Sequence, residues 1–469
     1  MEETGGPPGR GVAFGRDWTQ GNIFHNLLRL SWPMAVSNVL MMLGPTIDMI
    51  WVGRLGASSI AGVGVAGIAV QLVMGAMMGL MMGMRAMIAR FIGAGDVDTA
   101  NHVARQAFVI SAVFAGIMAI VGSFFSRPIL DLFGLEPDVV SEGAAYLRIL
   151  FIGAAAMSFR MMAEGIMQAS GDTITPMGIS VVYRLFHVAL CPFLIFGWWI
   201  FPSLGVSGAA LTNVISQSLG VLIGMWFLFT GRSLVFLGFS PSRMRLSMKN
   251  FRLDLDIIWR IIKIGFPALV SGIQRTLSQF FIMLFMAPFG TVAVAAHSIN
   301  QRIEMILIMP GFAFGMGSGV LVGQNLGAGQ PDRAERSAWL AVGLVEALMA
   351  IGAVVILVWA EGIIHIFNAE PELISLGAIF LRIAVAGYIV LGFMSVMMQA
   401  LNGAGDTVPT MIVSMVMMWA VTIPLAYFLP KYTDLNVYGV RWGMAAGMIV
   451  GAIAYTVYFR AGRWKRKKV

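Results

Sequence analysis

Four acidic side chains lie within stretches of the sequence that are otherwise apolar: Asp48, Glu164, Glu304 and Glu346. Asp48 follows an uncharged run over residues 30–47. If these stretches cross a bilayer, a charge near the middle costs about 2.5–3.5 kcal/mol, so an acid there is by default a candidate functional group. Asp48 is the strongest candidate for loading and releasing a coupling ion. The alternative is a carboxylate that reaches the membrane surface, because Arg54 is only six residues further on.

A histidine, an arginine and a thiol share one predicted helix elsewhere in the sequence. His187 lies about one helical turn from both Arg184 and Cys191, and all three therefore share a helix face. His187 could share a proton with Asp48 across the bundle. A hydrogen bond to a neighbouring helix would explain the histidine equally well.

The second half of the chain carries a comparable set of charges. Glu304 and Arg275 belong to adjacent apolar stretches and are predicted to pair. That pair could anchor the structure, or it could open when a cationic substrate competes for Glu304. Arg160 and Glu164 are four residues apart, which favours a structural ion pair on one helix. Glu346 is interpreted as structural or as lying at the boundary of its span.

Uncharged polar groups could complete a substrate cavity together with Asp48, Arg184, Arg275 and Glu304. The candidates are Asn213, Gln274, Gln279, Asn300 and Gln301. Hydrogen bonds between helices, worth about 0.6 kcal/mol each, are the simpler explanation for such residues.

The sequence shows none of the motifs of enzymes or metal proteins. There is no HExxH, no cysteine cluster and no Ser/His/Asp set in a supporting context. The Gly-Ala-Gly tripeptides at 93–95 and 327–329 are interpreted as helix C-caps, because no Lys-Ser/Thr follows them. We therefore predict a protein that is not an enzyme and has no bound metal or cofactor.

The composition shows which elements must position these residues. Of the 469 residues, 12% are charged and 58% are apolar, whereas a typical globular domain has about 25% charged residues. Runs of about 20 apolar residues suffice to cross a bilayer. The sequence predicts an all-α integral membrane protein with twelve transmembrane helices. They start near Leu30, Ile60, His102, Gly143, Met177, Gly205, Ile261, Val294, Ser337, Gly377, Thr410 and Gly439.

Lysine and arginine are distributed unequally between the two sides of these spans. The termini and the even-numbered loops hold 21 of them, and the odd-numbered loops hold three. By the positive-inside rule, both termini are predicted to be cytoplasmic, in a multi-pass protein of the inner (cell) membrane. The net charge of +8 then reflects topology and contact with anionic lipid headgroups, and no nucleic-acid partner is expected.

The two halves of the sequence repeat each other at an offset of 234 residues. Pro33 corresponds to Pro267, Gly-Ala-Gly at 93–95 to 327–329, and Gly-Asp-Thr at 171–173 to 405–407. Each half has an even number of spans, so the halves are parallel repeats, as in transporters. The predicted organisation is a disordered cytoplasmic tail (1–22), an N-lobe of six helices (23–230), a cytoplasmic connector (231–260), a C-lobe of six helices (261–460) and a basic tail (461–469).

Several segments resemble the multidrug and toxic compound extrusion (MATE) transporters. They are PMAVSNVLMMLGPTIDMIWVGRLG (33–56), QASGDTITPM (168–177) and APFGTVAVAAHSINQRIEMILIMPGFAFGMGSGVLVGQNLGAG (287–329). The resemblance implies two six-helix lobes around a central cleft. It also implies Na⁺- or H⁺-driven export of small cationic, amphipathic compounds, with Asp48 matching the functional acid of the first helix. We expect a monomer.

The sequence departs from both branches that it resembles. The DinF-like pattern Asn-x-x-x-Asp-Pro in the fifth helix is replaced by His187, Cys191 and Pro192. The acids of helices seven and ten in the NorM-like branch are replaced by Arg275 and Leu391. Because Na⁺ needs several oxygen ligands, H⁺ coupling is favoured over Na⁺.

Two other functions are left open by the sequence. A flippase for lipid-linked intermediates would use cationic residues such as Arg184 and Arg275 to hold phosphates, although flippases of the same superfamily usually have more helices. A membrane receptor or scaffold without transport activity would not need the repeat or the acid in the first span.

Overall fold

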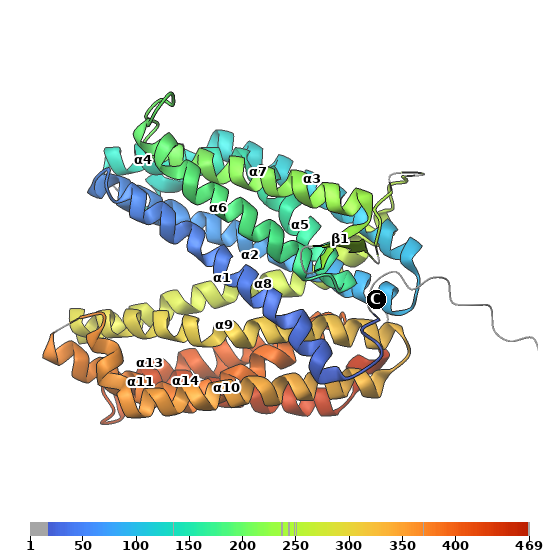
Figure 1. Cartoon of the computed structure of the whole chain (residues 1–469). Coiled ribbons are helices and arrows are strands. Elements are labelled where there is room, and N and C mark those ends of the chain that lie inside the picture. The colour runs from blue at the N-terminus through green and yellow to red at the C-terminus, as the bar shows by residue number, and fades with distance from the viewer. Residues whose placement is uncertain are drawn as a thin grey trace, which may run out of the picture.

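Long apolar runs form long helices, which pack into two bundles (Figure 1). The structure is a computed structural model that describes residues 17–134, 136–235, 238–242, 244–247, 249, 251–368 and 370–467. The all-helical class is confirmed, with one exception in the connector, where β1 (Arg232–Val235) and β2 (Gly238–Pro241) form an antiparallel hairpin. That hairpin, with two strands of four residues each, is too short to stand out from a loop in the sequence.

The first lobe consists of seven helices that make six crossings. They are α1 (Ile23–Val52), α2 (Ala57–Gly93), α3 (Val97–Asp131), α4 (Pro137–Ile152), α5 (Ala154–Ser170), α6 (Ile174–Phe196) and α7 (Val206–Thr230). Helices α4 and α5 form one broken span, bent by 48° at Gly153. The sequence predicts a continuous helix there, because a single glycine is an ambiguous breaker.

The second lobe repeats this order. It contains α8 (Leu255–Met286), η1 (Ala287–Phe289), α9 (Thr291–Gly327), α10 (Pro331–His365), α11 (Pro371–Gly403), α12 (Thr407–Met415), η2 (Val416–Thr422), α13 (Ile423–Tyr432), α14 (Val437–Arg460) and η3 (Arg463–Arg466). Helix α12, the π-helical segment η2 and α13 form one span, Thr407–Tyr432.

Ten helical spans in the described part of the chain are long and apolar enough to cross a membrane, or eleven if the bent α4–α5 pair is counted as one more. The remaining span of the predicted twelve corresponds to α8, whose Arg260, Lys263 and Arg275 lower its hydropathy. The predicted starts agree well with the helices. The largest offset is at the first span, predicted near Leu30 and observed to begin at Ile23.

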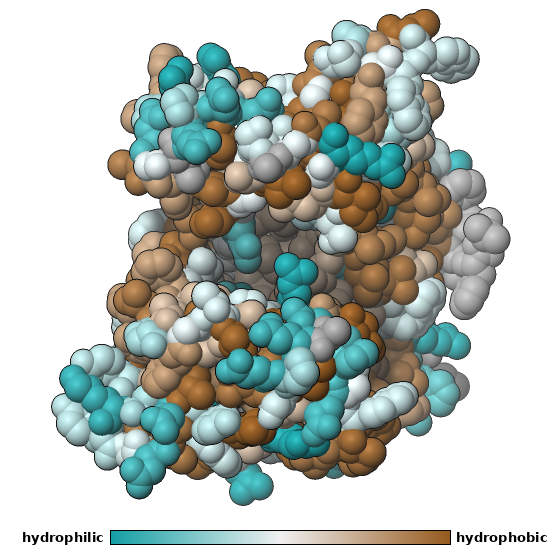
Figure 2. All heavy atoms as spheres, turned by 90° about the vertical axis from the view of Figure 1, so that its left-hand side faces the viewer, coloured by the Kyte–Doolittle hydropathy of each residue, from teal (hydrophilic) through white to brown (hydrophobic). Residues whose placement is uncertain are grey.

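The two lobes contact each other through α1, α2, α8 and α9. Gly93 and Gly327, which are equivalent in the 234-residue repeat, allow the closest approach. A Cβ on Gly93 would lie 2.0 Å from the carbonyl oxygen of Gln324, and one on Gly327 would lie 2.0 Å from that of Arg90. At the opposite end, which carries the turns after α1, α3 and α8, the molecule is hollowed between the lobes (Figure 2).

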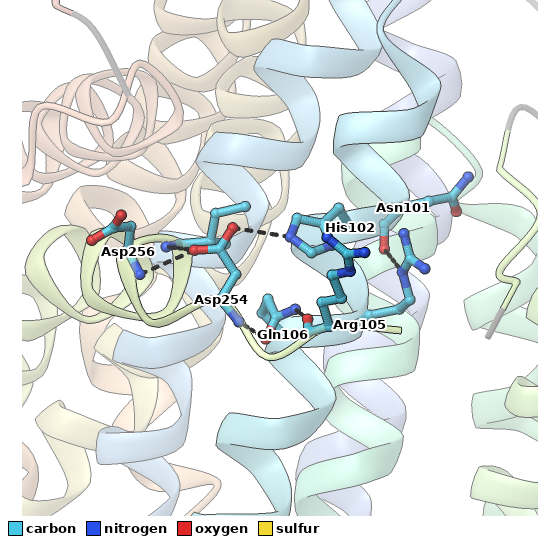
Figure 3. A network of polar contacts seen from close by, with 8 residues as sticks. Asn101, His102, Arg105, Gln106, Asp254 and Asp256 are labelled. Atoms are coloured by element: carbon cyan, nitrogen blue, oxygen red, sulfur yellow. Dashed lines mark hydrogen bonds and ion pairs between the residues drawn. The ribbon is translucent and has the colours of Figure 1, made fainter. Parts of the chain in front are cut away.

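The C-terminal end of the connector between the lobes is fixed to the first lobe (Figure 3). His102 Nε2 on α3 lies 3.0 Å from Asp254 Oδ2. Gln106 donates to the carbonyl oxygen of Arg252 and accepts from the backbone N–H of Asp254. Asp254 also caps α8 by accepting from Ile257 N–H. The last residues of the connector are therefore part of the lobe surface.

Both described ends of the chain lie at the closed end of the molecule (Figure 1). Residues 1–16 of the predicted disordered tail lie outside the described part, whereas 17–22 form a turn in which Asn22 caps α1. At the other terminus Trp464 is fully buried and stacks on Phe459. Lys465 pairs with Glu335 at 2.5 Å. This part of the basic tail therefore packs on the protein through Trp464 and Lys465.

Candidate functional site

Asp48, His187 and Cys191 converge inside the first lobe. Asp48 is on α1, while His187 and Cys191 are four residues apart on α6 and point to the same side. Each of the three is at most 1% exposed. His187 Nε2 lies 3.1 Å from Asp48 Oδ1, an ion-pair distance, but without the alignment of a hydrogen bond. The Cys191 thiol donates to the same oxygen at 3.7 Å.

A cavity of about 100 Å³ adjoins this cluster. Its wall includes four of the predicted site residues: Asp48, Arg184, His187 and Asn213. It also includes aromatic and apolar side chains, among them Tyr146, Tyr183 and Met157. The cavity therefore combines a buried carboxylate with polarisable and aromatic surface, as small-molecule sites commonly do.

Two arginines give this wall positive charge as well. Arg160 pairs with Glu164 at 2.7 Å on α5, the structural pair that their spacing predicts. Arg184 has no acidic partner at ion-pair distance among the described residues, and its Nη1 lies 3.4 Å from Nδ1 of His187. Gly44 on α1 makes room for its guanidinium, because a Cβ there would lie 2.1 Å from Nη1.

The predicted pair of Glu304 with Arg275 is wrong. Glu304 on α9 instead contacts Arg441 Nη1 on α14 at 3.0 Å and accepts a hydrogen bond from Tyr388 on α11. Arg275 is exposed on α8. Adjacent helices in sequence need not turn their charged faces toward each other, and α9 turns Glu304 toward α11 and α14.

The remaining polar candidates lie in the second lobe, away from the lining of the cavity. Gln274 donates to Ser414, and Asn300 donates to the carbonyl oxygens of Ala296 and Gly377. Gln279 is exposed and Gln301 is half-buried. The structure thus divides the predicted substrate residues between two lobes, and Gln274 and Asn300 join neighbouring helices through hydrogen bonds.

Two residues of the second lobe were missed by sequence reasoning. Arg441 is 2% exposed, within an apolar run, so its position in a span could have drawn attention to it. His297 is fully buried, and its ring nitrogens have no hydrogen-bond partner within the described chain. Neither residue belongs to a recognisable motif. The repeat gives no signal either, because the residue equivalent to Arg441 is Ser207 and the residue equivalent to His297 is Val63.

Comparisons with known proteins agree with this architecture. The sequence model of the MatE family matches residues 33–193 and again 267–428, which reproduces the internal repeat. The probable multidrug resistance protein YoeA of Bacillus subtilis is 25% identical over 439 residues, 93% of each chain. The probable multidrug resistance protein NorM of Thermotoga maritima is 26% identical over 454 residues, 94% of this chain and 93% of its own.

The same fold occurs in solved structures. The outward-facing conformation of a multidrug resistance MATE family transporter superposes with a TM-score of 0.85 at 23% identity, over 95% of this chain and 96% of that one. Two repeated helical lobes around a hollow, with buried charges beside a cavity, define a membrane transporter. The family is then settled by the two matches of its model: this chain belongs to the MatE family.

Proposed function

We propose that this protein is a cation-coupled antiporter that exports cationic or amphipathic compounds by alternating access, with H⁺ as the coupling ion. The observation that carries the proposal is the environment of Asp48. Its carboxylate is buried and borders a cavity, and one of its oxygens contacts both His187 and Cys191. Membership of a family with multidrug relatives supports the substrate class.

The ligands around Asp48 favour H⁺ over Na⁺. A Na⁺ site would need several oxygen atoms, but the neighbours of the carboxylate are a ring nitrogen and a sulfur. A proton needs only the carboxylate and a second acceptor, and His187 is placed to share it. Glu304 is a weaker candidate, because Arg441 already balances its charge.

The distribution of positive charge supports cytoplasmic termini and a location in the inner membrane. In that orientation the hollow of Figure 2 opens away from the cytoplasm. A compound could leave the protein there without crossing the closed contact at Gly93 and Gly327. Each chain contains both lobes and the whole cavity, which supports a functional monomer.

Uptake of a fluorescent organic cation into everted vesicles, whose outer face is the cytoplasmic face, tests the proposal. We expect a pH gradient, and not a Na⁺ gradient, to drive transport by the wild type, and Asp48→Asn to abolish it. Asp131→Asn removes an exposed acid at the end of α3 and is the matched control. Transport by Asp48→Asn at the wild-type rate, with equal protein in the membrane, would refute the coupling role.

A second candidate function is suggested by Arg184. Its guanidinium in the cavity wall has no acidic partner among the described residues, which favours a substrate with an anionic group, as in a flippase for lipid-linked phosphates. Arg184→Gln distinguishes the two: it should impair transport of a phosphate-bearing lipid but spare that of a cation. If no compound of either class moves, the third alternative, a receptor or scaffold, is favoured.

A further inference from the structure

We propose that Asp48, His187 and Cys191 form a binding site for a thiolate-preferring divalent cation, for which Zn²⁺ is the natural probe. Each residue offers one ligand atom, and the three atoms lie within 4.8 Å of one another. One atom is an oxygen, one a nitrogen and one a sulfur, which is the ligand chemistry of Zn²⁺ and not that of Na⁺, Mg²⁺ or Ca²⁺.

The separations of these atoms match a tetrahedral ion. With Zn–O and Zn–N bonds of about 2.0 Å and Zn–S of about 2.3 Å, tetrahedral ligands lie about 3.3–3.6 Å apart. Here nitrogen to oxygen is 3.1 Å and sulfur to oxygen is 3.7 Å. The third separation, nitrogen to sulfur, is within 4.8 Å, so binding requires side-chain rotations that bring these two atoms together by at most about an ångström.

The charges and the exposure of the cluster also suit such an ion. Asp48 and the Cys191 thiolate would together neutralise two positive charges, which lowers the cost of burying the ion. Asp48 Oδ2 has no partner among the described residues. Asp48 and His187 both border the cavity, so an ion can enter there and keep a water molecule as its fourth ligand.

Arg184 disfavours the binding of a metal ion to Nε2 of His187. Its Nη1 lies 3.4 Å from Nδ1, the ring nitrogen that must carry the proton when Nε2 binds a metal. Glutamine at this position would remove the positive charge and could accept a hydrogen bond from Nδ1–H. Arg184→Gln should therefore tighten metal binding, whereas a nonspecific surface site would be indifferent to it.

Co²⁺ titration of the purified full-length protein, carrying an affinity tag without histidine, tests the site. Cys191 is the only cysteine of the chain, so a thiolate-to-cobalt absorption band can arise only there. We expect one equivalent to bind with that band, and Zn²⁺ to displace it. Cys191→Ser and His187→Gln should each weaken Zn²⁺ binding more than about 100-fold, beyond the 10–100-fold effect of outer-shell groups.

His365→Gln, at an exposed position on α10, is the matched control and should bind as the wild type does. A second measurement uses stability: Zn²⁺ should raise the Tm of the wild type and leave that of Cys191→Ser unchanged. Binding without the thiolate band, or an equal shift of Tm in both proteins, would overturn the site. These measurements need neither substrate nor gradient, so a failure of the proposed transport function would leave their outcome unaffected.

Discussion

The ion pair between Glu304 and Arg441 joins two helices inside the second lobe. The Arg441 side chain is 1% exposed and that of Glu304 is 16% exposed, so both charges lie in a medium of low polarity. Arg441 Nε and Nη2 have no further partners among the described residues. The guanidinium therefore depends on Glu304 for most of its compensation, and the pair holds α9 to α14.

Arg441→Met should destabilise the protein more than the double variant Arg441→Met/Glu304→Gln. Removing one partner leaves a buried charge uncompensated, which typically costs about 3–5 kcal/mol, whereas replacing both is often close to neutral. The measurement is the apparent Tm of each purified variant in the same detergent.

The same double variant decides what Glu304 does. If it recovers both the Tm and the efflux of the wild type, then Glu304 is a structural anchor. If it recovers the Tm alone, then the carboxylate also takes part in transport. A single Arg441→Met variant as stable as the wild type would show that the pair contributes nothing to folding.

At the scale of elements, the connection between the lobes is an ordered contact. The carboxylate of Asp254 is held by the N–H of Ile257 at the start of α8 and by His102 on α3 (Figure 3). These hydrogen bonds, with that of Ile257 contributing most, lower the pKa of Asp254 below its ordinary value. Because the pKa of Asp254 is lower in the folded state, the ionised carboxylate favours docking of the connector on α3.

The connector should therefore undock in acid. Its docking is fully stabilised above the ordinary pKa of aspartate, about 4, and this contribution is lost as the pH falls through the lower value of the folded state. Hydrogen exchange of residues 251–257 should accelerate over that range. Asp254→Asn keeps the cap without the titrating group, and its exchange should show no such acceleration. An identical pH profile in both proteins would contradict this account.

Helices were predictable from the sequence because a membrane span needs little more than length and apolarity. Every predicted start falls near an observed one, and the repeat is real. The break at Gly153, the π-helical turn at Val416–Thr422 and the docked connector depend on contacts between elements. The same limit applies to the site. His187 and Cys191 share a face by spacing alone, but the partner of Glu304 depends on how three helices are rotated.

At the scale of the whole molecule, the repeat creates a symmetric contact where the lobes meet. Gly93 at the end of α2 lies against Gln324, and its repeat equivalent Gly327 at the end of α9 lies against Arg90. Only glycine allows these backbones to approach so closely. The tail adds to this closure, because Arg90 donates to the carbonyl oxygen of Lys467. The closed end is thus built from both lobes, and we expect this contact to keep the hollow at the other end open.

Widening this contact should move the two lobes as rigid bodies. A methyl group on Gly93 would overlap the Gln324 carbonyl, so Gly93→Ala must push α2 and α9 apart and favour the conformation in which the opposite end closes. Spin labels at 132 and 366, exposed and equivalent in the repeat, with Cys191 replaced by serine, report that end. Their distance should shorten in Gly93→Ala. Gly75→Ala, on the same helix with no atom near the added methyl group, should leave it unchanged. If Gly75→Ala shortens the distance equally, the effect comes from the helix itself, and the symmetric contact does not hold the hollow open.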